Sequence, residues 1–216
     1  MKNKKKVILI SCICAVAVIA MAAGAVVLMN RSGKVADEQK APEATQAPVV
    51  TATPEPTKDP HEGMVRSNLT GEYITEKVAE KRPYAVIINN IEYANANQQG
   101  TSQIDVLYEA LAEGGITRML GVIQDVDKIK KLGSVRSARH YFVSFASEWD
   151  AIFCHFGQTK YAISKIEELG INNLSGLSAV GPVVYARDYS YKAPHNVFTT
   201  GKKMKKGAKK LGYRTK

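Results

Sequence analysis

The feature that most constrains this 216-residue chain is an uncharged apolar run near its N-terminus. The run, VILISCICAVAVIAMAAGAVVLM at residues 7–29, is 23 residues long, and a helix needs about 20 apolar residues to cross a bilayer. Lysines crowd the residues just before it, and such positive flanks stay on the cytoplasmic side. The sequence therefore predicts a cytoplasmic basic tip at 1–6, a transmembrane signal-anchor at 7–29, and an extracytoplasmic location for everything after it.

Two other fates of the apolar run stay open, and both rank below the anchor. The stretch Leu9-Ile10-Ser11-Cys12 resembles a bacterial lipobox, so Cys12 could carry a lipid anchor instead. However, only five residues separate Lys6 from Cys12, fewer than the roughly 7–15 apolar residues of a signal peptide. Ala20-Met21-Ala22 has the small-x-small form of a cleavage site, but the apolar run continues beyond it.

A proline-rich stretch follows the apolar run. Residues 35–62 hold five of the eight prolines and no aromatic residue. Such a segment cannot bury enough apolar surface to fold. We therefore predict a disordered Pro/Thr/Ala-rich linker at 30–80 and one folded extracytoplasmic domain at 81–216.

The net charge of +10 could indicate a nucleic-acid partner, but its distribution argues against one. Four lysines precede the apolar run, and eight basic residues lie in 202–216, which hold no acid. The remaining 18 basic residues face 20 acidic ones. A nucleic-acid binder carries its basic stripe within the folded domain, so no nucleic acid is expected. The lysine-rich tail has Met204, Ala208 and Leu211 at helical spacing, which predicts a surface helix.

Hydrophobic patterning predicts the fold class of residues 81–216. Strands are expected at 84–90, 119–124, 151–157 and 183–187, and helices at 102–113, 137–148 and 160–170. Alternating strands and helices favour an α/β domain with a mostly parallel sheet flanked by helices. In such sheets, ligands gather at the carboxyl ends of the strands.

Several charged residues lie at predicted helix ends where the helix dipole disfavours a charge of their sign. Glu109 and Glu113 share a face of the predicted helix at 102–113, and Glu113 lies in its last turn. Arg136 and Arg139 lie at the start of the next predicted helix. A helix start favours acids and a helix end favours bases. Local rules broken in this way often mark a functional site.

Two interpretations of these charges remain. The arginines, with Arg118 after the glycine turn, can pair with Glu113 and bridge two elements. Alternatively, they hold an external phosphate or carboxylate together with helix-start amides, with Ser137 as the N-cap. We expect Arg136 to be structural and Arg139 to face the ligand.

Two histidines add to the candidate set. His155 ends the predicted strand at 151–157, and His195 lies beside Asn196 in KAPHNVF. If the sheet is parallel, His155 should converge with the arginines at one edge, whereas the position of His195 is less constrained. No HExxH or CxxC spacing is present, so neither a metal nor a cofactor is expected. Cys154 is expected to be a small buried hydrophobe.

Four stretches together carry a resemblance to a known family: RPYAVIINN (82–90), DVLYEALAEGGITRML (105–120), GSVRSARHYF (133–142) with DAIFCHFG (150–157), and YKAPHNVFT (191–199). The chain resembles the YerB-like family of bacterial membrane-attached lipoproteins, in their N-terminal domain of unknown function. The resemblance implies an extracytoplasmic domain with no established activity. The matching positions are Glu109, Glu113, Gly114, Gly115, Thr117, Arg118, Arg136, Ser137, Arg139, His155, His195 and Asn196.

The chain departs from the family pattern in three ways. Its lipobox is weak, and Gln158 stands where a second glycine is expected. Family members also carry a second, C-terminal domain, whereas this sequence ends at GYRTK (212–216). We therefore expect a C-terminally truncated chain, and a site shared between two domains would be incomplete in it.

Two functions from different classes follow from these observations. In the first, a membrane-anchored domain binds an anionic cell-wall polymer or an envelope protein through its Arg/Glu/His cluster. In the second, an enzyme acts on cell-wall glycopolymers as a hydrolase or transferase, with the arginines clamping an anion and Glu113 or His155 as acid/base. The sequence holds no recognisable nucleophile or metal motif, which favours binding.

Overall fold

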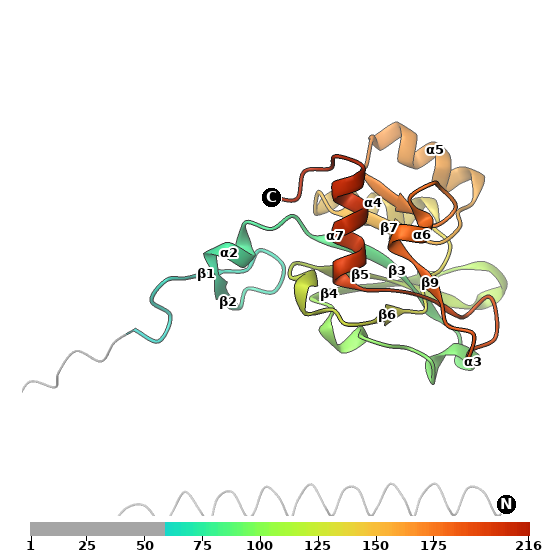
Figure 1. Ribbon diagram of the computed structural model, residues 1–216, viewed down its shortest axis with the longest axis horizontal. Helices are drawn as coiled ribbons and strands as arrows, with labels where there is room; N and C mark the ends of the chain where they lie inside the picture. Colours follow the sequence, from blue (N-terminus) through green and yellow to red (C-terminus); the bar gives the residue numbers. More distant parts are fainter. Residues whose placement is uncertain (1–58) are drawn as a thin grey trace, which may run out of the picture. The chain divides into compact units, whose positions relative to one another are not determined.

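The computed structural model describes residues 59–216 (Figure 1). The predicted basic tip at 1–6, the predicted anchor at 7–29 and most of the predicted linker lie outside the described residues. Among residues 59–216, no helix is both long and apolar enough to span a bilayer.

A five-stranded sheet forms the centre of the domain, in the order β4-β5-β3-β7-β8. Its strands are β3 (Tyr84–Asn90), β4 (Val106–Leu111), β5 (Thr117–Ile123), β7 (Ile152–His155) and β8 (Asn173–Ser175). β3, β7 and β8 run parallel, whereas β4 and β5 pair antiparallel with each other and β5 pairs antiparallel with β3. The α/β class is confirmed, but the sheet is mixed rather than mostly parallel.

The sheet is mixed because part of the segment predicted as a helix at 102–113 is instead a strand that runs antiparallel to β5. The helix prediction is therefore wrong. Residues 106–111 form β4, the edge strand of a hairpin with β5, and alternate between half-buried and exposed positions. Leu107 and Leu111 gave the sequence its helical period, yet they are 52% and 68% exposed. Asp105, just before this strand, accepts a hydrogen bond from the backbone amide of Gln124 at 2.7 Å. The period therefore did not reflect burial.

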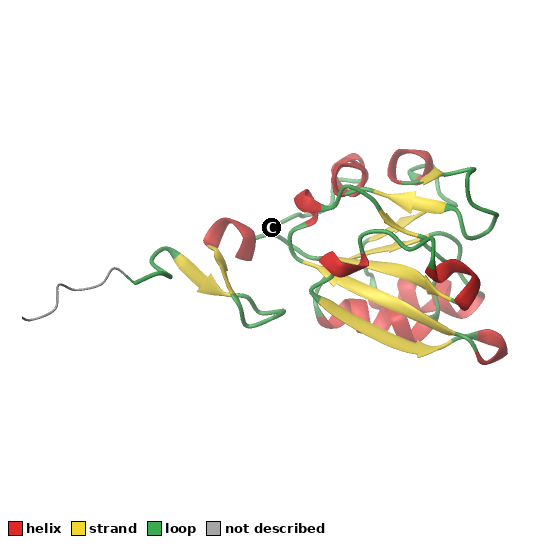
Figure 2. Cartoon of the chain, turned by 90° about the horizontal axis from the view of Figure 1, so that it is seen from below, coloured by secondary structure: helices red, strands yellow, loops and turns green. Residues whose placement is uncertain are grey.

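Helices cover both faces of the sheet (Figures 1 and 2). On one face, Ala85, Ile87, Leu120 and Phe153 pack with residues of α4 (His140–Glu148), and α5 (Lys160–Leu169) adds Ala162 and Ile166. On the other face, the alternate residues of the same strands pack with α6 (Gly181–Val184) and α7 (Gly201–Lys210). Strand alternation thus divides the apolar residues between two cores.

The remaining elements lie around this sheet. β6 (Leu132–Gly133), β9 (Ala186–Arg187) and β10 (Val197–Thr199) form a second sheet in the order β6-β10-β9. The predicted strand at 183–187 is therefore wrong over its first half, because α6 ends at Val184. α3 (Glu92–Asn95) follows β3 directly.

The predicted linker boundary at residue 80 is also wrong. β1 (Met64–Arg66) and β2 (Tyr73–Thr75) form an antiparallel hairpin, and α2 (Glu76–Ala79) leads from it towards β3. The ring of His61 stacks on Tyr73 with 3.7 Å between centroids. Within the described residues, regular structure thus begins at Met64, 17 residues before the predicted domain start at 81.

Other predicted elements are confirmed. The strands expected at 84–90, 119–124 and 151–157 and the helix at 160–170 are present within a few residues. The helix expected at 137–148 begins at His140, so its N-cap is Arg139 and not Ser137. Cys154 is fully buried in β7, as expected. The tail forms α7, but one face of it is buried at Met204, Gly207 and Ala208.

The first turn of α7 offers a test of how this helix packs. A Cβ atom added at Gly201 would lie 1.6 Å from the carbonyl oxygen of Val126, so Gly201→Ala must displace the helix start. We expect the free energy of unfolding to fall by about 1–3 kcal/mol, as for other overpacked sites. Lys210→Ala, at an exposed position of the same helix, should change it by less than about 0.5 kcal/mol. Urea denaturation of both variants measures this, and equal stability of the two would contradict the packing of α7.

Candidate functional site

The GSVRSAR stretch lies between the carboxyl ends of two central strands. β3 and β7 pair directly only from Tyr84 to Val86. Beyond these pairs, the amide of Arg136 donates to the carbonyl of Ile87 on β3 at 3.1 Å, and the amide of Phe156 donates to the carbonyl of Arg136 at 2.9 Å. The stretch thus satisfies main-chain groups of both strands where they no longer pair with each other. Arg136 is fixed at the strand ends, where ligands gather in α/β sheets.

Arg139 is held by the β4–β5 turn. Its Nη2 donates to Oε2 of Glu113 at 2.5 Å, and its Nε donates to Oε1 of the same carboxylate. Its Nη1 donates to the carbonyls of Ser137 and Ala138 at 3.2 and 2.9 Å. This confirms that Glu113 pairs with an arginine, and a two-bond fork of this kind is the strong form of the pair. Arg139 is therefore not an arginine left without an acidic partner.

Glu113 reaches Arg139 from a tight turn rather than from a helix end. The turn is a short 3₁₀ helix at Glu113–Gly115, in which Gly114 and Gly115 have φ of 69° and 74°. Only glycine adopts this left-handed region freely. The hydrogen bonds from Arg139 lower the pKa of Glu113 to about 2, although burial acts against this. The carboxylate is therefore ionised at neutral pH.

Arg118 lies beneath this pair on β5. It is 3% exposed, and its Nη1 donates to the carbonyl of Ser137 at 2.8 Å. Its Nε is buried without a hydrogen-bond partner in the described structure. Burial lowers the pKa of Arg118 to about 10, and the charges of Arg139 and Arg136 add to this effect. Three guanidinium groups thus lie close enough to repel one another.

Arg136 has neither the ion pair of Arg139 nor the near-complete burial of Arg118. Its Nη1 donates to the carbonyl of Pro194 at 3.1 Å, and its Nε is buried without a partner in the described structure. Within residues 59–216, neither Arg136 nor Arg118 forms an ion pair with an acid. Burial and the charge of Arg139 lower the pKa of Arg136. The expectation that Arg136 is structural and Arg139 faces a ligand thus finds no support in these contacts, and a ligand-binding role for either stays a prediction.

His195 lies beside Arg136. Its Nδ1 is 2.7 Å from Nδ2 of Asn89, and Tyr93 packs edge-on with 5.5 Å between ring centroids. Desolvation lowers the pKa of His195, and the charge of Arg136 lowers it further. Asn89 was not among the predicted site residues. The signal that could have found it is a pair of polar amides, Asn89 and Asn90, at the carboxyl end of a buried apolar strand.

Three predicted site residues form no hydrogen bond or ion pair with Arg118, Arg136 or Arg139 within residues 59–216. Glu109 accepts hydrogen bonds from Asn90 and Thr117 at 2.8 and 2.5 Å. Because its neighbour Ala110 is the cross-strand partner of Arg118, Glu109 points to the opposite face of the sheet. The predicted shared helix face of Glu109 and Glu113 is therefore wrong.

The other two are His155 and Asn196. His155 ends β7 as predicted, but its ring is buried, with Nδ1 2.9 Å from the carbonyl oxygen of Gly157 and Nε2 3.3 Å from Oδ1 of Asn173. Burial lowers its pKa, although both hydrogen bonds act against this. Asn196 is buried and accepts from Arg187 at 2.7 Å. Both residues stabilise the surrounding loops rather than meet the arginines.

The cluster therefore consists of Arg118, Arg136 and Arg139 with one acid, Glu113, and with His195 at its margin. Three guanidinium groups against one carboxylate leave a local excess of positive charge. Such a set can bind an anion by charge-assisted hydrogen bonds. No group of His, Cys, Asp and Glu side chains within residues 59–216 could hold a metal ion.

Fold and cluster together define a class: a mixed α/β domain with a partly buried arginine cluster at the carboxyl ends of its central strands. Residues 69–214 match the family described as "Protein of unknown function (DUF3048) N-terminal domain". The chain belongs to this family.

Similar proteins agree with this assignment. The Bacillus subtilis (strain 168) protein named "Putative lipoprotein YerB" is 40% identical over 152 residues, which cover 70% of this chain and 45% of that protein. A crystal structure of YerB protein from Bacillus subtilis superposes with a TM-score of 0.65 and 38% identity, over 70% of this chain and 51% of that one. The chain thus spans about half the length of these relatives. The YerB-like resemblance is confirmed.

A double-mutant cycle tests the Glu113–Arg139 pair. Glu113→Gln, Arg139→Gln and the double variant should give a coupling free energy of about 0.5–1 kcal/mol at pH 7, modest because the carboxylate is 61% exposed. The pKa of Glu113 is lowered from 4.5 to about 2 on folding, so this coupling is present above about pH 4.5 and lost as the pH falls through about 2. Urea denaturation at several pH values measures it. A coupling that is zero at pH 7, or unchanged at pH 2, would contradict the pairing.

Proposed function

We propose that this domain binds an anionic ligand of the cell envelope at the arginine cluster. The observation that carries the proposal is that Arg118 and Arg136 are partly or fully buried, lie near Arg139, and have no acidic partner within residues 59–216. A partly buried cation without a counter-charge costs free energy. A bound phosphate or carboxylate would offset both this desolvation and the mutual repulsion.

Arg136 is the residue proposed to meet the ligand. Arg139 is already engaged by Glu113, and Arg118 is almost fully covered. Arg136 is only half-buried, and the one hydrogen bond of its guanidinium within the described structure is to the Pro194 carbonyl. His195 borders it, and with Nδ1 accepting from the Asn89 side-chain amide its neutral ring carries an Nε2–H that can add a further donor. The ligand would therefore sit beside Arg136 and His195 at the ends of β3 and β7.

The geometry supports binding over catalysis. The acid/base candidates for a glycopolymer enzyme were Glu113 and His155. Glu113 is ionised, with a pKa of about 2, and both its oxygens accept from Arg139. His155 is buried, with both ring nitrogens near protein oxygens. Neither side chain is poised near neutral pH with free access to a substrate, as a general acid or base must be.

The proposal includes attachment to the outer face of the cell membrane. The name of the Bacillus subtilis relative favours a lipid anchor, which in this chain would be at Cys12 within Leu9-Ile10-Ser11-Cys12. The 23-residue apolar run at 7–29 favours a single transmembrane helix. Either form would hold the folded domain outside the cell, where a cell-wall polymer or an envelope protein is accessible.

Inorganic phosphate tests the ligand site. For the full chain in neutral detergent, we expect phosphate at constant ionic strength to raise the Tm by about 2 °C or more, by mass action. Arg136→Gln should abolish the response with little change in the Tm of the phosphate-free protein, because it removes an unpaired cation. Arg139→Gln should lower that Tm, because it leaves Glu113 unpaired.

Arg66→Gln is the matched control, since Arg66 lies on β1 and its guanidinium donates to the carbonyl of Gly71 and lies over the Tyr73 ring. It removes the same charge and should keep the phosphate response. A response that survives in Arg136→Gln, or is lost equally in Arg66→Gln, would contradict the proposal.

The membrane attachment is tested separately. Protease added to protoplasts should release a soluble fragment containing residues 81–216, because the linker is expected outside the cell. Protection of the chain until the cells are lysed would reverse the orientation. Fatty-acid labelling that disappears in Cys12→Ser would establish the lipid anchor, and labelling absent from the parent chain would establish the transmembrane form.

A further inference from the structure

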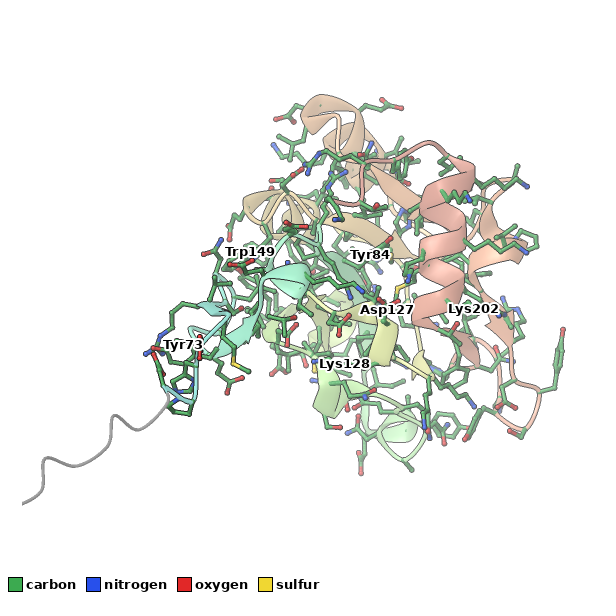
Figure 3. The ribbon with its side chains drawn as sticks, turned by 60° about the vertical axis from the view of Figure 1, so that its left-hand side comes forward. Tyr73, Tyr84, Asp127, Lys128, Trp149 and Lys202 are labelled. Atoms are coloured by element: carbon green, nitrogen blue, oxygen red, sulfur yellow. The ribbon has the colours of Figure 1, made fainter. Side chains whose placement is uncertain are left out.

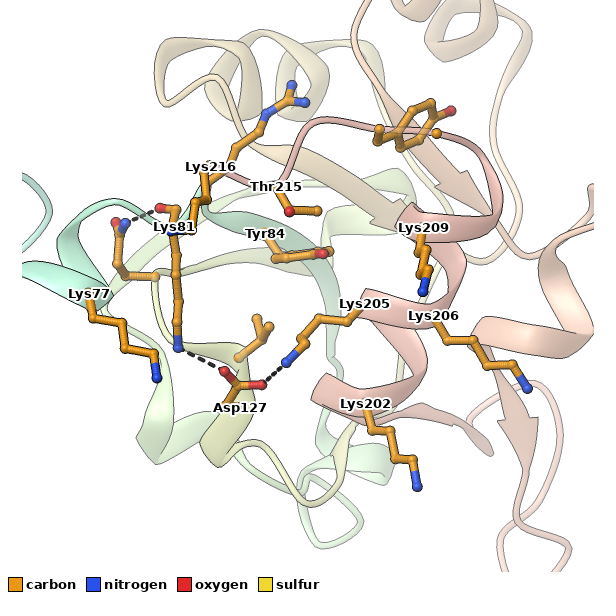
Figure 4. Close-up of a pocket in the computed structure, with 15 residues that line it drawn as sticks. Lys77, Lys81, Tyr84, Asp127, Lys202, Lys205, Lys206, Lys209, Thr215 and Lys216 are labelled. Carbon is orange, nitrogen blue, oxygen red and sulfur yellow. Dashed lines mark hydrogen bonds and ion pairs between the residues drawn. The ribbon is translucent and has the colours of Figure 1, made fainter.

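A second basic feature lies at the amino end of β3, away from the arginine cluster. There a cavity of about 870 Å³ opens between α2 and α7. Figure 3 shows Tyr84, Asp127 and Lys202 in this region, and Figure 4 shows it in close-up. β3 has seven residues and rises about 3.3 Å per residue, so its two ends are about 20 Å apart. The cavity and the arginine cluster are therefore separate sites.

The lining of the cavity is strongly basic. It contains seven lysines, one arginine and a single acid, Asp127. Asp127 accepts from Lys81 at 2.8 Å and from Lys205, and these bonds lower its pKa to about 2. The Asp127 carboxylate thus links Lys81, on one wall of the cavity, to Lys205 of α7 on the other (Figure 4). Its single charge cannot balance the eight cations around it.

Half of these cations are held by protein groups. Lys81 and Lys205 pair with Asp127, Arg82 pairs with Asp150 at 2.9 Å, and Lys216 pairs with Glu80 at 2.9 Å. The other four are Lys77, Lys202, Lys206 and Lys209, and none of them forms an ion pair within residues 59–216. These four lysines are the charges left for a ligand.

Their arrangement indicates the shape of the ligand. Lys202, Lys206 and Lys209 are spaced i, i+4 and i+7, which places them along one face of α7 over about 10 Å. Lys77 approaches from α2 on the opposite wall. A single phosphate cannot reach so extended a row, whereas a chain of linked phosphates can. Lysine suits this chemistry because its ammonium is a point charge on a flexible stem that tolerates varied phosphate positions.

The floor beneath the lysines is fixed and apolar. Tyr84, Val126 and Tyr213 line the cavity, and Tyr84 and Val126 belong to the buried core. The cavity lies within the usual size range of ligand pockets, roughly 300–1,000 Å³. A concave site of this size fits a discrete chain better than a flat membrane surface.

We propose that this cavity, hereafter the lysine pocket, binds a linear chain of phosphate groups. The phosphates lie along the α7 lysines, with Lys77 closing over them from the opposite wall. The interaction is electrostatic, so it weakens as salt is added. This binding does not depend on the arginine cluster.

The chain offers a matched pair of variants to test the pocket. Lys202→Gln/Lys209→Gln removes two pocket lysines. Lys203→Gln/Lys210→Gln removes the next lysine along the same helix in each case, and neither of these lines the cavity. Both double variants change the net charge equally and alter only helix-surface positions.

Isothermal titration of the full chain in neutral detergent with soluble linear polyphosphate measures the binding. We expect the pocket variant to bind about fivefold or more weakly than the parent, as for two partly screened charge contacts. The neighbouring variant should bind within about twofold of the parent. The same difference between the two lysine variants should persist in an Arg136→Gln background, which removes the proposed anion contact of the arginine cluster. Affinity should fall steeply between about 50 and about 300 mM salt.

Four results would overturn the inference. Equal weakening in the two lysine variants would mean that only the overall charge matters. No binding of polyphosphate by the parent chain would exclude the ligand class. Binding to vesicles of anionic phospholipid without binding to soluble polyphosphate would make α7 a membrane contact instead. Loss of polyphosphate binding in Arg136→Gln alone would assign the ligand to the arginine cluster.

Discussion

The site depends on the main chain of Arg136, which lies between β3 and β7. Its amide donates to Ile87 on one strand, and its carbonyl accepts from Phe156 after the other. This insertion places the next carbonyl, that of Ser137, where it accepts from both Arg118 and Arg139 at 2.8 and 3.2 Å. One backbone oxygen thus holds two guanidinium groups together, and the cluster follows from main-chain pairing rather than from ion pairs alone.

This arrangement concentrates positive charge that the described part of the chain does not neutralise. Glu113 balances one guanidinium, and its exposed carboxylate adds only modest stability. Arg118 and Arg136 remain near each other with buried Nε groups that lack partners there. A buried charge is normally paired, because an unpaired one pays a desolvation cost that nothing offsets. An excess of arginines at the carboxyl ends of strands is more typical of a site that an anion completes.

Much of this could be predicted from sequence, and the failures have identifiable causes. Strands β3, β5 and β7 are buried on both faces, so continuous apolar runs revealed them. β4 is an edge strand in which Leu107 and Leu111 are exposed. Their spacing of four residues is also typical of one face of a helix, so a helix was predicted there. The grouping of Glu113 with the arginines was foreseen from charges at unfavourable positions, but the different contacts of Arg136 and Arg139 within it were not. Those contacts depend on the position of Glu113 in the β4–β5 turn. The local sequence around the arginines does not indicate which of them this turn will approach. The lysine pocket was missed because its walls, α2 and α7, are 120 residues apart in sequence.

The central claim is that the arginine cluster is completed by an external anion. The most direct measurement is a crystal structure of the domain grown with tungstate, an anomalous scatterer that mimics phosphate. The account predicts an anomalous peak within hydrogen-bond distance of the Arg136 guanidinium, at the ends of β3 and β7, with Glu113 still bound to Arg139. A structure with tungstate absent from the cluster, and with Arg118 and Arg136 fully hydrogen-bonded to protein atoms, would contradict it.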